Sequence, residues 1–167
     1  MNTPEGRALE IPSATMQSNA RSLGKLAGLI ANNGILHSNN STSNSDTAPT
    51  TSYTYPLLTP ATISAMCADP VTRPDPLMDS TFSFTQGGFS RFDDFQSQHS
   101  SIVSDTFQQD FRHFEGWGGI GGSWFVFDRV RGVGLAYTMN GIALSSLGGC
   151  RSDRIMQAVQ RVLKRIH

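Results

Sequence analysis

The sequence predicts an α+β fold in which an antiparallel sheet packs against helices, on three observations. Ser123–Phe127 is an aromatic strand candidate, Asp128–Arg131 a turn, and Gly132–Met139 a second strand, which together predict a β-hairpin. Apolar residues recur at helical spacing over Ala20–Asn32 and again after Ser152. The first strand of the hairpin is apolar on both faces and therefore needs cover on both, and the final helix can cover one of them.

The first predicted helix covers Ala20–Asn32. Ser18 or Asn19 can accept hydrogen bonds from the free N–H groups at its start. Asn33 and Gly34 tolerate the left-handed conformation in which many helices end. Apolar residues one turn apart predict a single buried stripe, formed by Leu23, Leu26, Ala27 and Ile30.

A polar segment follows this helix, and residues 37–55 are expected to form a disordered polar insertion, because the run from His37 to Ser52 has no apolar periodicity and little to bury. Thr59 is then a suitable N-cap, with Pro60 at the first position of a short helix that extends through Met66. Thr81–Thr85 alternates polar and aromatic residues and predicts a strand that Gly87-Gly88 ends.

The last predicted element is a C-terminal helix capped by Ser152. Its apolar residues are expected to form one stripe that covers the sheet, namely Ile155, Val159, Val162, Leu163 and Ile166. Arg161, Lys164 and Arg165 near its end complement the helix dipole.

Composition limits the classes of function. The 167 residues suit one domain, and 13 basic residues balance 13 acidic ones, which argues against nucleic acid or an acidic membrane as partner and favours a small neutral one. Cys67 and Cys150 lack metal-ligand spacing and are expected to be buried thiols, so no metal and no cofactor is expected. Without a run of ~20 apolar residues or an apolar leader, the chain is expected to be soluble and cytoplasmic.

The segment from Trp117 to Asp128 is the most informative one for chemistry. Its glycines are expected at a strand start, where backbone N–H groups can approach a substrate oxygen because no Cβ intervenes. A packed hairpin or bulge is the alternative explanation of the same glycines. Asp128 is expected to close the hairpin turn, without a catalytic part.

Several motifs resemble the C-terminal portion of the serine β-lactamase-related family, which includes class C β-lactamases, penicillin-binding proteins and family VIII-type esterases. The specific part is Trp117-Gly118-Gly119, then Gly121-Gly122-Ser123, an aromatic strand ending in Asp128, a Gly-rich strand ending in Asn140, and a final helix. Three earlier segments resemble the family's "NGG" turn, "LLSPE" helix start and "FGLGF" strand: Asn33-Gly34, Leu57–Pro60 and Phe82–Phe89.

The resemblance implies that residues 1–167 are the C-terminal part of one β-lactamase-related domain, with an incomplete β-lactamase/transpeptidase-like fold. It assigns the oxyanion-hole donor to the Ile120 N–H and leaves room for an acyl group beside Gly118 and Gly119. Trp117 takes the place of a cation, so the resemblance implies a small neutral ester or acyl substrate rather than a β-lactam. The alternative interpretation is that Trp117 only packs against the end of the strand.

The family's catalysis requires Ser-x-x-Lys and a Tyr-x-Asn or Tyr-x-Ser motif. Ser22-Leu23-Gly24-Lys25 matches the first in letters, but it lies in a helix that resembles a later, non-catalytic segment, so Ser22 and Lys25 are not assigned as nucleophile and base. The tyrosine motif is absent, and His113 is expected to be an exposed loop residue. The expectation is therefore a hydrolase fragment or degenerate homologue that is inactive alone and self-associates through an unpaired sheet edge, with a non-catalytic binding module as the alternative.

Overall fold

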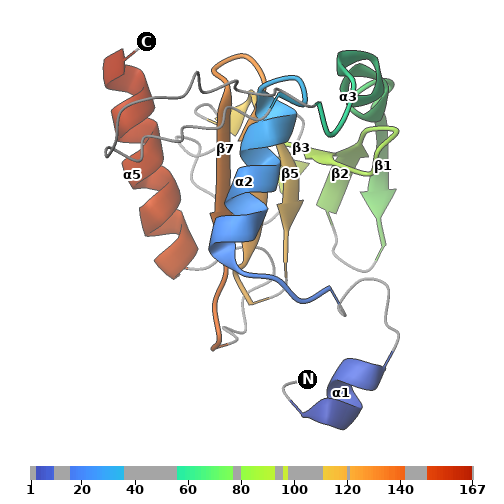
Figure 1. The fold of residues 1–167 in the computed structure, drawn as a ribbon, viewed down its shortest axis with the longest axis vertical. Helices are drawn as coiled ribbons and strands as arrows, with labels where there is room; N and C mark the ends of the chain where they lie inside the picture. The colour runs from blue at the N-terminus through green and yellow to red at the C-terminus, as the bar shows by residue number, and fades with distance from the viewer. Residues whose placement is uncertain are drawn as a thin grey trace, which may run out of the picture.

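The antiparallel sheet is the centre of the fold in the computed structural model (Figure 1). The structure describes residues 3–9, 16–35, 56–76, 80–92, 96–97, 111–119, 121–141 and 150–166. The insertion predicted at 37–55 therefore lies outside the described residues. The α+β class predicted from the sequence is confirmed.

The main path of the sheet runs in the order β1-β2-β3-β5-β6-β7, and β4 pairs with β2 away from that path. All of these pairings are antiparallel. The strands are β1 (Val71–Asp75), β2 (Ser80–Phe84), β3 (Ser90–Arg91), β4 (Gln96–Ser97), β5 (Phe114–Gly118), β6 (Trp124–Asp128) and β7 (Val133–Tyr137). The helices are α1 (Pro4–Ala8), α2 (Ala20–Ala31), α3 (Pro60–Met66) and α5 (Cys150–Ile166).

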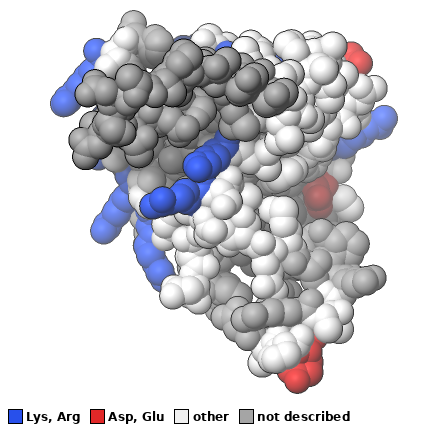
Figure 2. Space-filling model, viewed as in Figure 1, with Lys and Arg blue, Asp and Glu red and all other residues white. Residues whose placement is uncertain are grey.

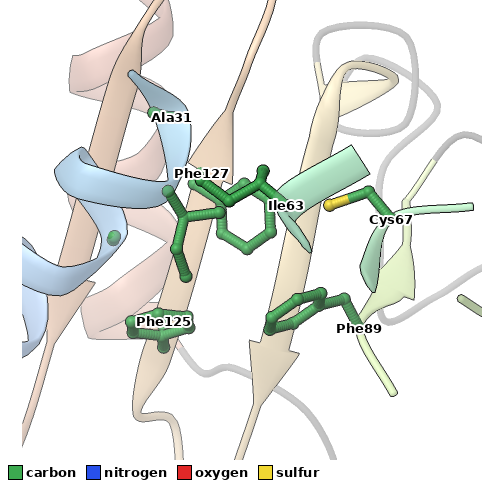
Figure 3. Packing of buried hydrophobic residues seen from close by; sticks show 8 residues of the cluster. Ala31, Ile63, Cys67, Phe89, Phe125 and Phe127 are labelled. Atoms are coloured by element: carbon green, nitrogen blue, oxygen red, sulfur yellow. The ribbon is translucent and has the colours of Figure 1, made fainter. Parts of the chain in front are cut away.

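Strand β6 belongs to two hydrophobic cores, one on each face of the sheet. Phe125 and Phe127 pack with residues of α2 and α3 on one face (Figure 3). Trp124 and Val126 point to the other face, where Met156 and Leu163 of α5 cover them. The alternation predicted from the sequence is confirmed, and the sheet has a helical layer on each side.

The β6–β7 turn is organised by Asp128, as predicted. One carboxylate oxygen of this fully buried residue accepts hydrogen bonds from the backbone N–H groups of Val130 and Arg131, at 2.8 and 3.0 Å. The other oxygen pairs with the Arg131 guanidinium at 3.0 Å. The turn is therefore held by one carboxylate whose charge is neutralised.

Helix α2 begins and ends as its sequence predicts. The Asn19 side chain accepts a hydrogen bond from the Ser22 N–H, and Asn33 and Gly34 have positive φ angles of 57° and 82°. The helix crosses β7 at very short range, because a Cβ on Gly134 would lie 2.0 Å from the Gly28 nitrogen. A glycine in β7 thus sets the distance between the helix and the sheet.

Helix α5 differs from its prediction in two ways. It begins at Cys150 rather than after Ser152, and Ser152 is a buried residue within the helix. The buried face is formed by Ser152, Met156, Gln160 and Leu163, whereas three members of the predicted stripe are exposed: Ile155, Val162 and Ile166. The predicted stripe is therefore displaced by one residue from the face that is buried. The prediction did not include Met156 or the small Ser152 among the residues that pack on the sheet. In α2, Leu26 is likewise exposed, although the prediction buried it.

Four strands were not predicted, and two of them, β3 and β4, have only two residues each. Strand β1 contains Pro74, which an edge strand tolerates because one row of its N–H groups has no ladder partner. Strand β5 was missed because its Phe114–Gly118 sequence mixes aromatic residues, an acid and glycines without regular alternation. Among the described helices, none has the length and apolarity required to cross a bilayer.

Candidate functional site

The tryptophan–glycine segment lies at the end of β5 and in the turn to β6. Trp117 and Gly118 are the last residues of β5, whereas Gly121 and Gly122 come just before the start of β6, where the sequence placed a strand start. The Gly119 N–H donates to the Ser123 carbonyl at 2.8 Å, and Gly122 donates to Gly119 at 3.0 Å. The glycines therefore form the turn of a packed hairpin, which the sequence allowed as the alternative. Ile120 lies outside the described residues, so its predicted role as oxyanion donor stays a prediction.

Trp117 is anchored by its neighbours and stays partly exposed. Its indole Nε1–H donates to the Gly88 carbonyl at 2.9 Å. The ring stacks on Phe125, with centroids 5.0 Å apart, and lies 5.2 Å from the ring of Phe89. Even so, 41% of the residue is exposed. Trp117 thus packs the strand end and also presents a fixed apolar surface to solvent.

Gly116 sets the backbone that leads into Trp117. Its φ angle is 146°, in the range that favours glycine, and a Cβ at this position would lie 2.1 Å from the Phe125 carbonyl oxygen. A side chain at position 116 would therefore push β5 away from β6. The close strand pairing that positions Trp117 on Phe125 depends on this glycine.

Gly118 lies beyond the last residue of β5 that pairs with β3. Because the Gly119 N–H bonds to β6, alternation along β5 directs the N–H and C=O of Gly118 to the opposite side, toward β3. Strand β3 pairs with β5 through Arg91 and Ser90, opposite Glu115 and Gly116. Within the described part of the chain, no strand pairs with β5 at Gly118 on that side. The end of β5 therefore offers backbone hydrogen-bonding groups beside the partly exposed Trp117.

A buried polar cluster lies two residues before Trp117. Glu115 is only 9% exposed and pairs with the Arg129 guanidinium, Nε to Oε2, at 3.3 Å. Burial, the hydrogen bond to Glu115 and the negative charge of Glu115 raise the pKa of the Cys67 thiol to about 12, against a smaller opposing effect of Arg129. The cluster joins the end of α3 to β5 and to the β6–β7 turn. Sequence reasoning missed it, although an acid inside an aromatic segment was a possible signal.

The structure does not bring Ser22 and Lys25 to Trp117. Both side chains are exposed, on a helix that packs over β6 and β7 rather than over β5 (Figure 1). His113 is exposed in the turn before β5, as predicted, and Cys67 is a buried free thiol. The side chain of Cys150 lies outside the described residues. No group of three or more metal-binding side chains occurs in the described ranges.

The comparisons with known proteins concern structure. No family model and no curated protein sequence matches the chain. A solved penicillin-binding protein homologue from Caulobacter crescentus is similar over 95% of this chain and 36% of its own, with a TM-score of 0.66 and 28% identity. A family VIII carboxylesterase is similar over 96% of this chain and 36% of its own, with a TM-score of 0.67 and 23% identity.

The chain spans about a third of the length of both solved structures. It shares with them the sheet and helices described above, over nearly all of its own length. The chain therefore has part of the fold of the serine β-lactamase-related family, which its sequence motifs resemble.

Proposed function

We propose that this chain carries the substrate-facing wall of a β-lactamase-related, esterase-like serine hydrolase and is inactive alone. The wall consists of Trp117, Gly118 and Gly119, with Ile120 as the expected oxyanion donor. The whole of a related enzyme is about three times as long as the matched part, so the nucleophile and base would belong to a region that this chain does not match.

The anchored indole of Trp117 is the observation that carries this proposal. The hydrogen bond to Gly88 and the stacking on Phe125 fix the ring, so that its exposed part would form an apolar wall next to the backbone groups of Gly118. An indole has no charge with which to bind a carboxylate. The site would therefore select neutral esters or acyl groups over substrates with an obligatory anionic group.

The binding part of the proposal can be tested by NMR with methyl butyrate as ligand. We expect chemical-shift changes at the amides of Gly118 and Gly119 and at the indole N–H of Trp117. The indole of Trp124 is the internal control, because this residue is 5% exposed on the opposite face of the sheet. Sodium butyrate should cause much smaller changes. Equal changes with the ester and the carboxylate, or changes at Trp124 alone, would contradict the proposal.

The catalytic part is tested by hydrolysis of 4-nitrophenyl butyrate and by labelling with a fluorophosphonate. We expect neither activity nor labelling in the isolated chain. Hydrolysis and labelling that are both lost in Ser22→Ala would show that the chain has its own nucleophile, and that the proposal of an inactive wall is wrong.

A non-catalytic binding module is the second candidate, and the exposed positions of Ser22 and Lys25 away from Trp117 favour it. The two candidates predict different results when this chain is combined with the rest of a related enzyme. If co-expression with the region of a family VIII-type esterase that this chain does not match produces hydrolysis, and Trp117→Lys lowers the activity toward neutral esters, the hydrolase wall is supported. Ester binding without any activity in that assembly supports the binding module.

A further inference from the structure

The turn between β2 and β3 supplies two of the contacts that hold Trp117. The Gly88 carbonyl accepts the hydrogen bond from the indole, and the Phe89 ring lies 5.2 Å from the indole ring. The turn itself is fixed by Thr85, whose N–H donates to the Phe89 carbonyl and whose carbonyl accepts from the Gly88 N–H, at 2.9 and 2.8 Å. The position of the indole therefore follows the position of this turn.

The same turn is attached to the C-terminal end of α3. The Gly87 N–H donates to the Met66 carbonyl at 2.7 Å, and the Gln86 N–H donates to the Ala68 carbonyl at 3.0 Å. Carbonyl groups in the last turn of a helix have no partner within the helix, so the bond to Met66 satisfies a group that α3 leaves free. A Cβ on Gly87 would lie 2.8 Å from the Met66 carbonyl oxygen, so this close approach requires glycine. The end of α3 therefore sets the position of the turn.

Cys67 attaches the end of α3 to β5. It directly follows the last residue of α3, and its buried thiol donates a hydrogen bond to the Glu115 carboxylate. Glu115 lies opposite Phe127, on the face of the sheet that packs with α2 and α3. Trp117 lies opposite Phe125, on the same face. The thiol therefore joins α3 to the strand that carries the indole, on the face where the indole lies.

Arg129 holds the Glu115 carboxylate in place. The Arg129 Nε lies 3.3 Å from Glu115 Oε2, and the two side chains are 35% and 12% exposed. Figure 2 shows several Lys and Arg side chains that project into solvent, where water and salt screen their charges. The pair of Glu115 and Arg129 is partly enclosed, so its attraction is screened less. The carboxylate that accepts the thiol hydrogen bond is therefore fixed by an ion pair to the residue that follows β6.

We propose that Cys67 and Glu115 are positioning residues for Trp117, which act through the end of α3 and the Gly88 carbonyl. The contacts form a closed ring that leaves β5 at Glu115 and returns to it at Trp117. A change at Cys67 or Glu115 therefore alters the orientation of the indole, although neither residue supplies its hydrogen-bond acceptor. The orientation of the indole is a property of the chain alone, whereas its effect on ester binding rests on the proposed function.

The first test compares Cys67→Ser with Cys67→Ala, which differ by a single oxygen atom. Serine keeps a donor for Glu115, and alanine does not. We expect the indole N–H of Trp117 to keep its NMR chemical shift in Cys67→Ser. In Cys67→Ala it should move to lower ppm and exchange up to roughly tenfold faster, which corresponds to the net free energy of one hydrogen bond.

The indole of Trp124 reports whether the fold of each variant is intact, because this residue is buried on the opposite face of the sheet. If Cys67 only packs, the apolar alanine should keep the Trp117 signal at least as well as serine does. That result would overturn the proposal.

The second test compares two neighbouring arginines that each pair with a buried acid. Arg129→Gln removes the partner of Glu115, so it should change the Trp117 indole signal in the same direction as Cys67→Ala. Arg131→Gln removes the partner of Asp128 in the same turn and should leave that signal unchanged. Equal changes in both variants would show a general effect of the turn and would contradict the proposal.

A double variant tests whether the thiol and the carboxylate act together. Glu115→Gln replaces the charged acceptor by a weaker, neutral one. Cys67→Ala combined with Glu115→Gln should change the Trp117 signal no more than the larger of the two single variants, because both weaken the same hydrogen bond. Changes that add in the double variant would show two independent effects and would overturn the proposal.

Gly87→Ala tests the step from α3 to the turn. Gly87 is not among the residues with a positive φ angle, so the added methyl group acts through its contact with Met66 rather than through backbone strain. We expect the Trp117 indole N–H to exchange faster, with the Trp124 signal retained. An unchanged Trp117 signal would show that α3 does not set the position of the turn, and the proposal would be wrong.

Methyl butyrate separates this inference from the proposed function. If the parent chain binds the ester, and Cys67→Ala and Glu115→Gln keep both the indole signal and the binding, the positioning role is wrong and the proposed function stands. If the indole signal changes in these variants as expected and the parent chain does not bind the ester, the positioning role is supported and the proposed function is contradicted.

Discussion

At the scale of single residues, Trp117 shows how one side chain can serve both packing and recognition. The indole is bonded to Gly88, which lies 29 positions earlier in the chain, and it is stacked on Phe125 of the neighbouring strand. A second ring, Phe89, also lies close to the indole, and 41% of the residue stays exposed. The stability of the strand end and the shape of the proposed wall therefore depend on the same residue.

Replacing Trp117 by phenylalanine separates the hydrogen bond from the aromatic contact. Phe keeps a ring over Phe125 but cannot donate to the Gly88 carbonyl. We expect the free energy of unfolding to fall by about 1 kcal/mol, the usual net value of one hydrogen bond at a partly exposed position. Urea unfolding with an unchanged m-value measures this difference. An unchanged free energy would show that the indole N–H makes no net contribution.

Cys67 gives a prediction on pH. Because its folded pKa of about 12 is above the ordinary value of 9.0, the protonated thiol stabilises the folded state below pH 9. That contribution is lost as the pH rises from 9 toward 12. In a Cys150→Ser background, the thiolate absorbance should therefore appear well above pH 9 in the folded protein.

Glu115→Gln tests how much the neighbouring carboxylate contributes to the raised pKa of Cys67. It removes the negative charge that helps to raise the pKa of Cys67, so the thiolate should appear at a lower pH than in the parent protein. Ionisation of Cys67 near pH 9 in the folded parent protein would contradict the buried contact with Glu115.

At the scale of elements, the contact between α2 and β7 is set by glycine. A Cβ on Gly134 would meet backbone atoms of α2, whereas a Cβ on Gly28 would meet nothing within 4 Å. The two glycines are thus not equivalent, although they lie in one contact. Only the strand residue must lack a side chain.

We expect Gly134→Ala to lower the free energy of unfolding by at least about 2 kcal/mol, because the helix must move off the sheet. Gly28→Ala should raise it by about 0.5–1 kcal/mol, since alanine is the better helix former and the space is open. Thermal and urea unfolding of the two variants measure both effects. Similar losses in both would show that the helix–strand distance is set by other residues.

The predictability of the elements depended on whether the signal was local. The caps of α2 and α3 and the turn at Asp128 were predicted because a short side chain and a nearby backbone group determine each of them. Strand β5 was not predicted, because the need for glycine at position 116 comes from the Phe125 carbonyl of the neighbouring strand. The sequence of β5 alone does not show this contact. The buried face of α5 was misassigned for a related reason: Ser152 and Gln160 become buried through the sheet that they contact, which the helix sequence alone does not show.

The candidate site shows the same difference between local signals and tertiary contacts. Trp117, Gly118 and Gly119 were recognised from their motif, and the structure places them together at one strand end. The partners that give the site its geometry were not predicted, since Gly88 meets Trp117, and Arg129 meets Glu115, only through tertiary contacts. Motif residues were therefore visible in the sequence, and the contacts that hold them were not.

At the scale of the whole molecule, β6 couples the two cores. Phe127 is fully buried on the α2 side and Met156 is 1% exposed on the α5 side. Phe127→Ala and Met156→Ala should each lower the stability by about 2–5 kcal/mol. Because one strand carries both cores, circular dichroism and tryptophan fluorescence should report one shared transition in each variant. Two separate transitions would show that the faces unfold independently.

The approach of α2 to β7 also has a consequence for synthesis. Asn32, directly after α2, donates to the carbonyl of Gly132, so the helix docks on a part of the chain that is made 100 residues later. At ribosomal rates of about 5–20 residues per second, that delay is roughly 5–20 s. During this time the apolar face of α2 has no sheet to cover it. A nascent chain arrested before β7 should therefore bind chaperones through α2, and one extended past Tyr137 should release them.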